Sequence, residues 1–206
     1  FLSARCAAGY NVCVFAYGQT GSGKTFTMVG APGMEGILPR AMRDIYAKKA
    51  ELAGEDDMNV KCYMLELYND QLVDLLVGHH VNEKDRKKLE IKKDAKGMIF
   101  VPGSTVKECP TLADLEECWK IGEGARHVGS TKMNAGSSRS HLIVSMLIET
   151  INKQTGKAAV GKLSLIDLAG SERAGKKLVA ELSARDSERE ARKSARQQAR
   201  HRKYLW

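Results

Sequence analysis

Residues 18–25 carry the side chains best suited to chemistry in this chain. They read Gly-Gln-Thr-Gly-Ser-Gly-Lys-Thr, which fits the phosphate-loop pattern of a glycine, four residues and then Gly-Lys-Ser/Thr. Glycines let the backbone curl so that several N–H groups converge on phosphate oxygens. Lys24 adds a mobile positive charge for the outer phosphates, and the Thr25 hydroxyl can bind magnesium. The spacing therefore predicts a site for nucleotide phosphates.

The segments on either side of this loop supply the context that the pattern needs. Residues 11–17 are mostly apolar and predict a buried strand. The residues after the loop can begin a helix, whose positive dipole end favours anions. Strand, glycine-rich turn and helix in this order favour a phosphate site over a chance glycine turn.

A second cluster follows the apolar run of residues 163–166. That run ends in Asp167, and Gly170 and Glu172 come soon after it. Phosphate-loop NTPases hold magnesium at such a strand-end Asp, often through water. Gly170 would allow a backbone N–H to approach a terminal phosphate. An Asp at the end of a strand is a weak signal alone, because strands usually end in a polar residue, but it gains weight beside residues 18–25.

A third cluster, residues 134–141, reads Asn-Ala-Gly-Ser-Ser-Arg-Ser-His. Its hydroxyl groups can reach magnesium and phosphate oxygens, and Arg139 can pair with a carboxylate or face the phosphates. A surface loop of turn-forming residues explains the same composition equally well.

Together, the three clusters resemble the motor domain of kinesins. Residues 15–25 match the phosphate loop of that family, residues 134–141 its first switch, and residues 167–172 its second switch. The resemblance runs from about residue 9 to residue 175. Residues 9–13, 91–94 and 140–145 are most similar to the kinesins with C-terminal, minus-end-directed motors, and within them to the kinesin-like calmodulin-binding proteins.

The resemblance implies that ATP and Mg²⁺ are the cofactors. It implies that Phe26 stacks on adenine and that the backbone N–H of Gly170 senses the γ-phosphate. The metal would be held by Thr25, Ser138 and, through water, Asp167. The residues that would wrap the phosphates are Gly18, Gln19, Thr20, Gly21, Ser22, Gly23, Lys24 and Thr25.

The same resemblance implies the catalytic residues. Arg139 and Glu172 would form the salt bridge that closes the two switches, with Ser138 beside them. Glu172 would help to accept the proton of the attacking water through a second water. Hydrolysis requires in-line water, neutralised phosphate charge and exclusion of solvent, and these residue types can supply all three.

The expected fold is α/β: a phosphate-loop NTPase fold of the kinesin motor type, with a central sheet, helices on both faces, and truncation at both ends. Helical spacing of apolar residues predicts helices over residues 37–52 and 111–126. Strands are expected at residues 60–68, 142–151 and 160–168. Residues 72–77 are expected to continue a strand or form a short helix, and residues 89–91 and 98–101 to form a hairpin.

Composition bounds the remaining possibilities. The chain has 206 residues, enough for one ordinary α/β domain, and no apolar stretch approaches the roughly 18 residues of a membrane helix. Its five cysteines are scattered, which favours a reducing, intracellular setting over a disulfide framework or zinc site. The chain does not begin with Met, so we expect a fragment. The net charge is +8, and most of it lies in residues 176–206, which carry ten Lys/Arg and four Asp/Glu.

These observations divide the chain into residues 1–175, a partial motor domain, and residues 176–206, a basic tail expected to be a solvated helix or disordered. The expected function is that of the Mg-dependent ATPase part of a microtubule motor. A non-motile nucleotide- or tubulin-binding fragment is the alternative. The resemblance implies microtubules as partner, calmodulin for the intact family member, a cytoplasmic, cytoskeletal location, and neither a membrane nor a specific nucleic acid.

Overall fold

The computed structural model describes residues 1–77, 88–93, 99–132 and 140–172. The chain divides into two compact units, Phe1–Ala169 and Gly170–Trp206. The sheet and the four helices of the described part all belong to the first unit. In the described residues, no helix is both long and apolar enough to cross a lipid bilayer.

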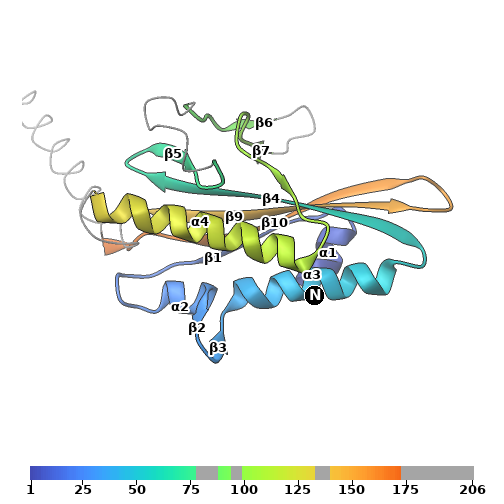
Figure 1. The fold of residues 1–206 in the computed structure, drawn as a ribbon, viewed down its shortest axis with the longest axis horizontal. Helices are drawn as coiled ribbons and strands as arrows, with labels where there is room; N and C mark the ends of the chain where they lie inside the picture. Colours follow the sequence, from blue (N-terminus) through green and yellow to red (C-terminus); the bar gives the residue numbers. More distant parts are fainter. Residues whose placement is uncertain (78–87, 94–98, 133–139, 173–206) are drawn as a thin grey trace, which may run out of the picture. The chain divides into compact units, whose positions relative to one another are not determined.

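One mixed sheet forms the centre of the first unit (Figure 1). Its strands lie in the order β1-β10-β9-β4-β5, and β8 pairs with β4 beside this path. β1 runs parallel to β10, and the other described pairs of this sheet are antiparallel. The bounds are β1 Asn11–Ala16, β4 Asp56–Tyr68, β5 Gln71–Asp74, β8 Lys107–Glu108, β9 His141–Asn152 and β10 Ala158–Asp167.

Helices and two small hairpins surround this sheet. The longest helix, α4, starts with a reciprocal cap: Thr111 Oγ1 accepts the Asp114 N–H at 3.3 Å, and the Asp114 carboxylate accepts the Thr111 N–H at 2.8 Å. The hairpins pair β2 with β3 and β6 with β7. The bounds are α1 Leu2–Ala7, α2 Lys24–Met28, β2 Gly30–Ala31, β3 Met34–Glu35, α3 Ile37–Leu52, β6 Lys92–Lys93, β7 Ile99–Phe100 and α4 Leu112–Lys132.

The main core lies between the helices and one face of the sheet. The even-numbered residues of β4 from Met58 to Met64 point into it. Glu66, the next even-numbered residue, lies on the same side of the strand but is charged. The opposite face carries Tyr63, which is covered by Leu89 from a loop. The sheet is flanked by helices as predicted, but the described helices all pack on one face, so the prediction of helices on both faces is wrong for these residues. Each helix contributes to the one core: Cys6, Met28, Ile45 and Leu115.

Two glycines let helices approach this face closely. A Cβ on Gly122 of α4 would lie 2.6 Å from the Met64 sulfur, and one on Gly161 of β10 would lie 2.8 Å from the Tyr10 carbonyl oxygen. Because neither glycine carries a side chain, α4 sits directly on β4 and α1 on β10. The seating of α4 brings its C-terminal half to the polar end of the core.

Most predicted elements are present with shifted ends. The helix over residues 37–52 has the predicted bounds, whereas α4 extends beyond residue 126 to Lys132 and β4 begins earlier, at Asp56. The predicted hairpin is present as β6 and β7, and its connection lies outside the described residues. The prediction for residues 72–77 is wrong: Asn69 and Asp70 adopt φ of 47° and 60° and turn the chain, so that β5 returns antiparallel along β4.

Candidate functional site

The phosphate loop joins the end of β1 to the start of α2. Gly21 and Gly23 have φ of 81° and 88°, in the left-handed region that favours glycine. A Cβ on either residue would meet no heavy atom of the described chain within 4 Å. The loop therefore curls as the sequence predicts and has open space beside Gly21 and Gly23.

A cavity of about 260 Å³ lies against this loop and α2. It is smaller than the roughly 300–1,000 Å³ of sites that enclose a drug-sized ligand, so it suits a chain of phosphates better than a whole nucleotide. Of the predicted loop residues, Gly18, Gln19 and Ser22 are not among those that line it. The lining residues are Thr20, Gly21, Gly23, Lys24, Thr25, Phe26 and Leu168.

Lys24 lies in the wall of this cavity, with its charge close to the loop. Its Nζ donates a hydrogen bond of 2.9 Å to the Gln19 carbonyl oxygen, and the Ser22 N–H donates to the same oxygen at 3.2 Å. The helix that follows has only five residues, so its dipole is small. The attraction of this loop for anions therefore comes mainly from Lys24 and the loop amides.

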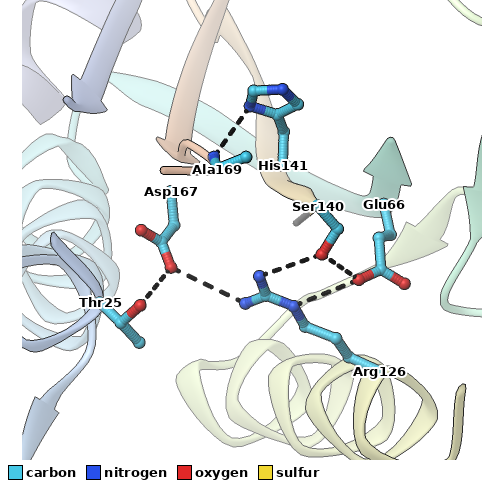
Figure 2. Close-up of polar contacts among 7 residues, drawn as sticks. All are labelled: Thr25, Glu66, Arg126, Ser140, His141, Asp167 and Ala169. Atoms are coloured by element: carbon cyan, nitrogen blue, oxygen red, sulfur yellow. Dashed lines mark hydrogen bonds and ion pairs between the residues drawn. The ribbon is translucent and has the colours of Figure 1, made fainter. Parts of the chain in front are cut away.

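Thr25 and Asp167 meet beside the cavity although 142 residues separate them. The Thr25 hydroxyl donates a hydrogen bond of 2.6 Å to Asp167 Oδ2, as Figure 2 shows. The contact follows from the sheet, because Ala16 at the end of β1 pairs with Asp167 at the end of the parallel strand β10. Sequence analysis singled out both residues, and the fold brings them together.

The Asp167 carboxylate is suited to hold a cation. The residue is only 3% exposed, and its Oδ1 has no hydrogen-bond partner in the part of the chain that the structure describes. A buried carboxylate oxygen without a partner is costly unless water or an ion satisfies it. Hydroxyl and carboxylate oxygens are the donors that Mg²⁺ prefers, so Thr25 and Asp167 fit a magnesium site.

Arg126 of α4 supplies the positive charge of this region. Its Nη1 lies 3.8 Å from Asp167 Oδ2 and its Nε lies 3.4 Å from Glu66 Oε1. The Ser140 hydroxyl donates to the same Glu66 oxygen at 2.5 Å, and Arg126 Nη2 donates to Ser140 at 3.5 Å (Figure 2). Arg126 thus joins the ends of β4, β9 and β10.

Sequence reasoning missed Arg126 and Glu66, although a signal for each was present. On α4, Leu115, Cys118 and Gly122 face the core, and Arg126 continues this spacing of three or four residues. On β4, Glu66 continues the alternation that buries Met64. A charged residue that falls on an apolar stripe needs a partner, and two such residues on different elements indicate a buried ion pair.

The segment after β10 is held from both sides. The Leu168 N–H donates to the Ala16 carbonyl oxygen of β1 at 3.3 Å. The next amide, that of Ala169, donates to Nδ1 of His141 at the start of β9, at 3.1 Å (Figure 2). Leu168 also lines the cavity, so these two bonds fix the backbone beside the phosphate loop.

The other predicted site residues are not described as part of the first unit. Ser138 and Arg139 are outside the described residues. Gly170 and Glu172 belong to the second compact unit. The predicted bridge between Arg139 and Glu172, the γ-phosphate contact of Gly170 and the magnesium contact of Ser138 therefore stay predictions.

Comparison with known proteins places this geometry in a family. The model of the kinesin motor domain family matches residues 2–195. Kinesin-like protein KIN-14E of Arabidopsis thaliana is 48% identical over 180 residues, which are 87% of this chain and 14% of that protein. Kinesin-like protein KIN-14I of Oryza sativa subsp. japonica is 48% identical over 168 residues, 82% of this chain and 13% of that protein.

Solved structures agree with the sequence comparisons. A fast kinesin, described with implications for ATPase mechanism and interactions with microtubules, superposes with a TM-score of 0.75 at 34% identity, over 84% of this chain and 49% of that chain. The C-terminal motor domain of Kar3 from Candida glabrata gives a TM-score of 0.69 at 35% identity, over 82% of this chain and 51% of that one. The chain thus spans about half of these motor structures and a much smaller share of the full-length relatives.

Proposed function

This chain belongs to the kinesin motor-domain family, and on that basis we propose that it is the ATP-binding and ATP-hydrolysing part of a microtubule-based motor. Kinesin motor domains are ATPases as a family. The observation that supports the proposal most directly is the meeting of Thr25 and Asp167 beside the phosphate-loop cavity. A hydroxyl from the loop and a carboxylate from a strand end are the pair that phosphate-loop NTPases use.

In this proposal the amides of residues 18–25 bind the phosphates of ATP, and Lys24 balances their charge. Thr25 and Ser138 hold Mg²⁺ directly, and Asp167 holds it through water. When bound, the metal neutralises phosphate charge and orients the terminal phosphate. Phe26, which is 49% exposed on the cavity wall, provides a flat apolar surface for adenine.

The proposed hydrolysis depends on one residue that precedes β9 and two that follow β10. Arg139 pairs with Glu172 and closes the site against bulk water, which strengthens the electrostatic contacts inside it. Glu172 accepts the proton of the attacking water through a second water. The Gly170 N–H donates to the γ-phosphate, so that loss of this phosphate releases the segment after β10.

We propose microtubules as the partner of the whole protein, in a cytoplasmic, cytoskeletal location. Lys92 and Lys93 of β6 are exposed and offer positive charge to the acidic surface of tubulin. The KIN-14 relatives and the C-terminal motor domain of Kar3 support a place for this chain among the kinesins with C-terminal motors. Calmodulin is proposed as a partner only for the intact protein, because the similarity to calmodulin-binding kinesins covers the motor segment alone.

The experiment that tests nucleotide binding is calorimetry with Mg-ATP on the wild-type chain and on Lys24→Ala. Loss of a charge-assisted contact to phosphate should weaken ATP binding on the order of 100-fold. The fold should persist, because Lys24 donates to one exposed backbone oxygen rather than to the core. Lys48→Ala, which breaks an exposed pair with Glu51 on α3, is the matched control and should bind like wild type.

Equal affinity of wild type and Lys24→Ala would overturn the assignment of the phosphate loop. The motor part of the proposal needs a separate measurement, the ATPase rate with and without microtubules. Strong acceleration by microtubules supports a motor segment. A rate that microtubules do not change would leave the non-motile binding fragment as the better description.

A further inference from the structure

The turn after β10 depends on one side chain outside its own strand. Leu168 and Ala169 leave β10 with their amides donating to opposite neighbours, the Ala16 carbonyl oxygen on β1 and His141 Nδ1 on β9. The first bond continues the parallel ladder of the sheet. The second lies beyond the β9–β10 ladder, which ends at the pair of Leu142 and Asp167. His141 thus holds the backbone at Ala169, one residue beyond Leu168, the last residue that a backbone hydrogen bond to β1 holds.

The bond also identifies the acceptor nitrogen of the His141 ring. Nδ1 accepts the Ala169 N–H, and a ring nitrogen accepts only through its free lone pair. The ring is half-buried and stands at the first position of β9, where its backbone pairs with Leu67 of β4. A position fixed by the sheet therefore presents an acceptor to a loop amide.

We propose that His141 is a positioning residue for the nucleotide site, acting through the Ala169 amide; this inference rests on the proposed ATP-binding function. Gly170 follows Ala169 directly in the chain, and its N–H is the group proposed to contact the γ-phosphate. A fixed Ala169 amide restricts the path on which that next N–H is offered. His141 should therefore affect the preference for a triphosphate over a diphosphate, rather than affinity for nucleotides in general.

Two substitutions separate the acceptor from the ring. His141→Leu keeps bulk at the position but removes the acceptor. His141→Asn places Oδ1 on the same Cγ that carries Nδ1 in histidine, so it restores an acceptor without the ring. All measurements use the full 206-residue chain with Mg²⁺, and displacement of a fluorescent ADP gives the Kd of ADP and of a non-hydrolysable ATP analogue. Hydrogen exchange of the peptide that contains Ala169 reports the bond itself.

We expect His141→Leu to speed exchange at Ala169 and to lower the preference for the triphosphate about fivefold, the value of one neutral hydrogen bond. Its affinity for ADP should stay within about twofold of wild type, since ADP lacks the γ-phosphate. His141→Asn should restore both the slow exchange and most of the preference.

The other outcomes overturn the inference in distinguishable ways. If the wild-type chain binds neither nucleotide, the proposed function fails and the inference fails with it. If wild type prefers the triphosphate and His141→Leu keeps that preference while exchange at Ala169 speeds up, the bond exists but does not position the site. If Asn behaves like Leu in both assays, the ring rather than its acceptor is what matters.

Discussion

Removing the guanidinium of Arg126 tests whether this side chain is the buried counter-charge of the site. Arg126 is 11% exposed and lies between Glu66 and Asp167, which are 16% and 3% exposed. The change Arg126→Met keeps an unbranched apolar stem but removes the cation that both carboxylates contact in the described part of the chain. Because both lie largely out of water, neither can be fully compensated by solvent.

The expected loss of unfolding free energy is about 3–5 kcal/mol, the usual cost of removing one partner of a buried ion pair. For a chain of this size, each kcal/mol lowers the melting temperature by about 2–4 °C, so Arg126→Met should melt about 10 °C below wild type. Urea unfolding followed by circular dichroism gives the free energy, and a thermal scan gives the melting temperature.

Two further variants show whether the loss comes from burial. Lys61→Met breaks the pair of Lys61 and Glu108, whose nitrogen and oxygen lie 2.7 Å apart but whose side chains are 40% and 68% exposed. Lys61→Met should change the unfolding free energy far less than Arg126→Met, although the distance between its charges is shorter, because solvent screens an exposed pair. Adding Glu66→Gln to Arg126→Met should restore about 1–3 kcal/mol of the lost unfolding free energy, because it removes one of the two unpaired carboxylate charges. If Arg126→Met unfolds within about 0.5 kcal/mol of wild type, the network is not a buried one and this reasoning fails.

Two other features of the fold give direct predictions. Gly161→Ala should lower the unfolding free energy by about 1–3 kcal/mol or more, because its Cβ would collide with the Cys6 carbonyl oxygen and lie 2.8 Å from the Tyr10 carbonyl oxygen. The control is Gly54→Ala, whose Cβ would have no described heavy atom within 4 Å. Urea unfolding should detect no loss of stability in this control. Mass spectrometry after brief alkylation at pH 8 should find Cys13 labelled first, because Cys13 is exposed and the other four cysteines are buried. Burial also raises the pKa of the thiols of Cys6, Cys62 and Cys109. The slower sites should gain reactivity as the pH rises, and equal labelling of all five at pH 8 would contradict the buried core.

Local patterns predicted the elements whose information is local. The helix over residues 37–52 was predicted with its observed ends because Leu38, Ala41, Met42 and Ile45 mark one face of it. The predicted end of α4, at Arg126, comes too early, because the stripe of apolar residues that indicates this helix stops at Ile121. In the structure Arg126 belongs to that stripe, and its partners on two strands make the burial of a charge acceptable.

What the sequence could not predict is the pairing of distant elements. Asp167 was singled out as a strand-end carboxylate, but its distance from Thr25 depends on β1 lying next to β10, and no local pattern specifies that order. The fold resemblance supplied this expectation instead. Similarly, apolar residues alternate on β4 towards both faces, so the pattern alone does not tell which face the helices cover.

The groups proposed to hold ligand are bonded to one another in this fold. The Thr25 hydroxyl donates to Asp167, and the Lys24 ammonium donates to the Gln19 carbonyl oxygen. Each of these two groups has a hydrogen-bond partner within the protein, so a ligand that takes either group must replace a bond. Binding must exchange these bonds for bonds to phosphate and metal.

That exchange explains why metal and phosphate should be needed together. A hydrogen bond to a charged group contributes about 1.5–3 kcal/mol. Phosphate without a metal would have to offset the loss of the Lys24 bond to Gln19, while the Thr25 hydroxyl stayed bonded to Asp167. In the proposed site, magnesium would compete for the second contact, because it prefers hydroxyl and carboxylate oxygens. Asp167 can let the Thr25 hydroxyl go more readily than an isolated carboxylate could, since Arg126 stays beside the same oxygen at 3.8 Å. In the proposed site, the buried arginine would therefore act on both stability and ligand exchange at one carboxylate.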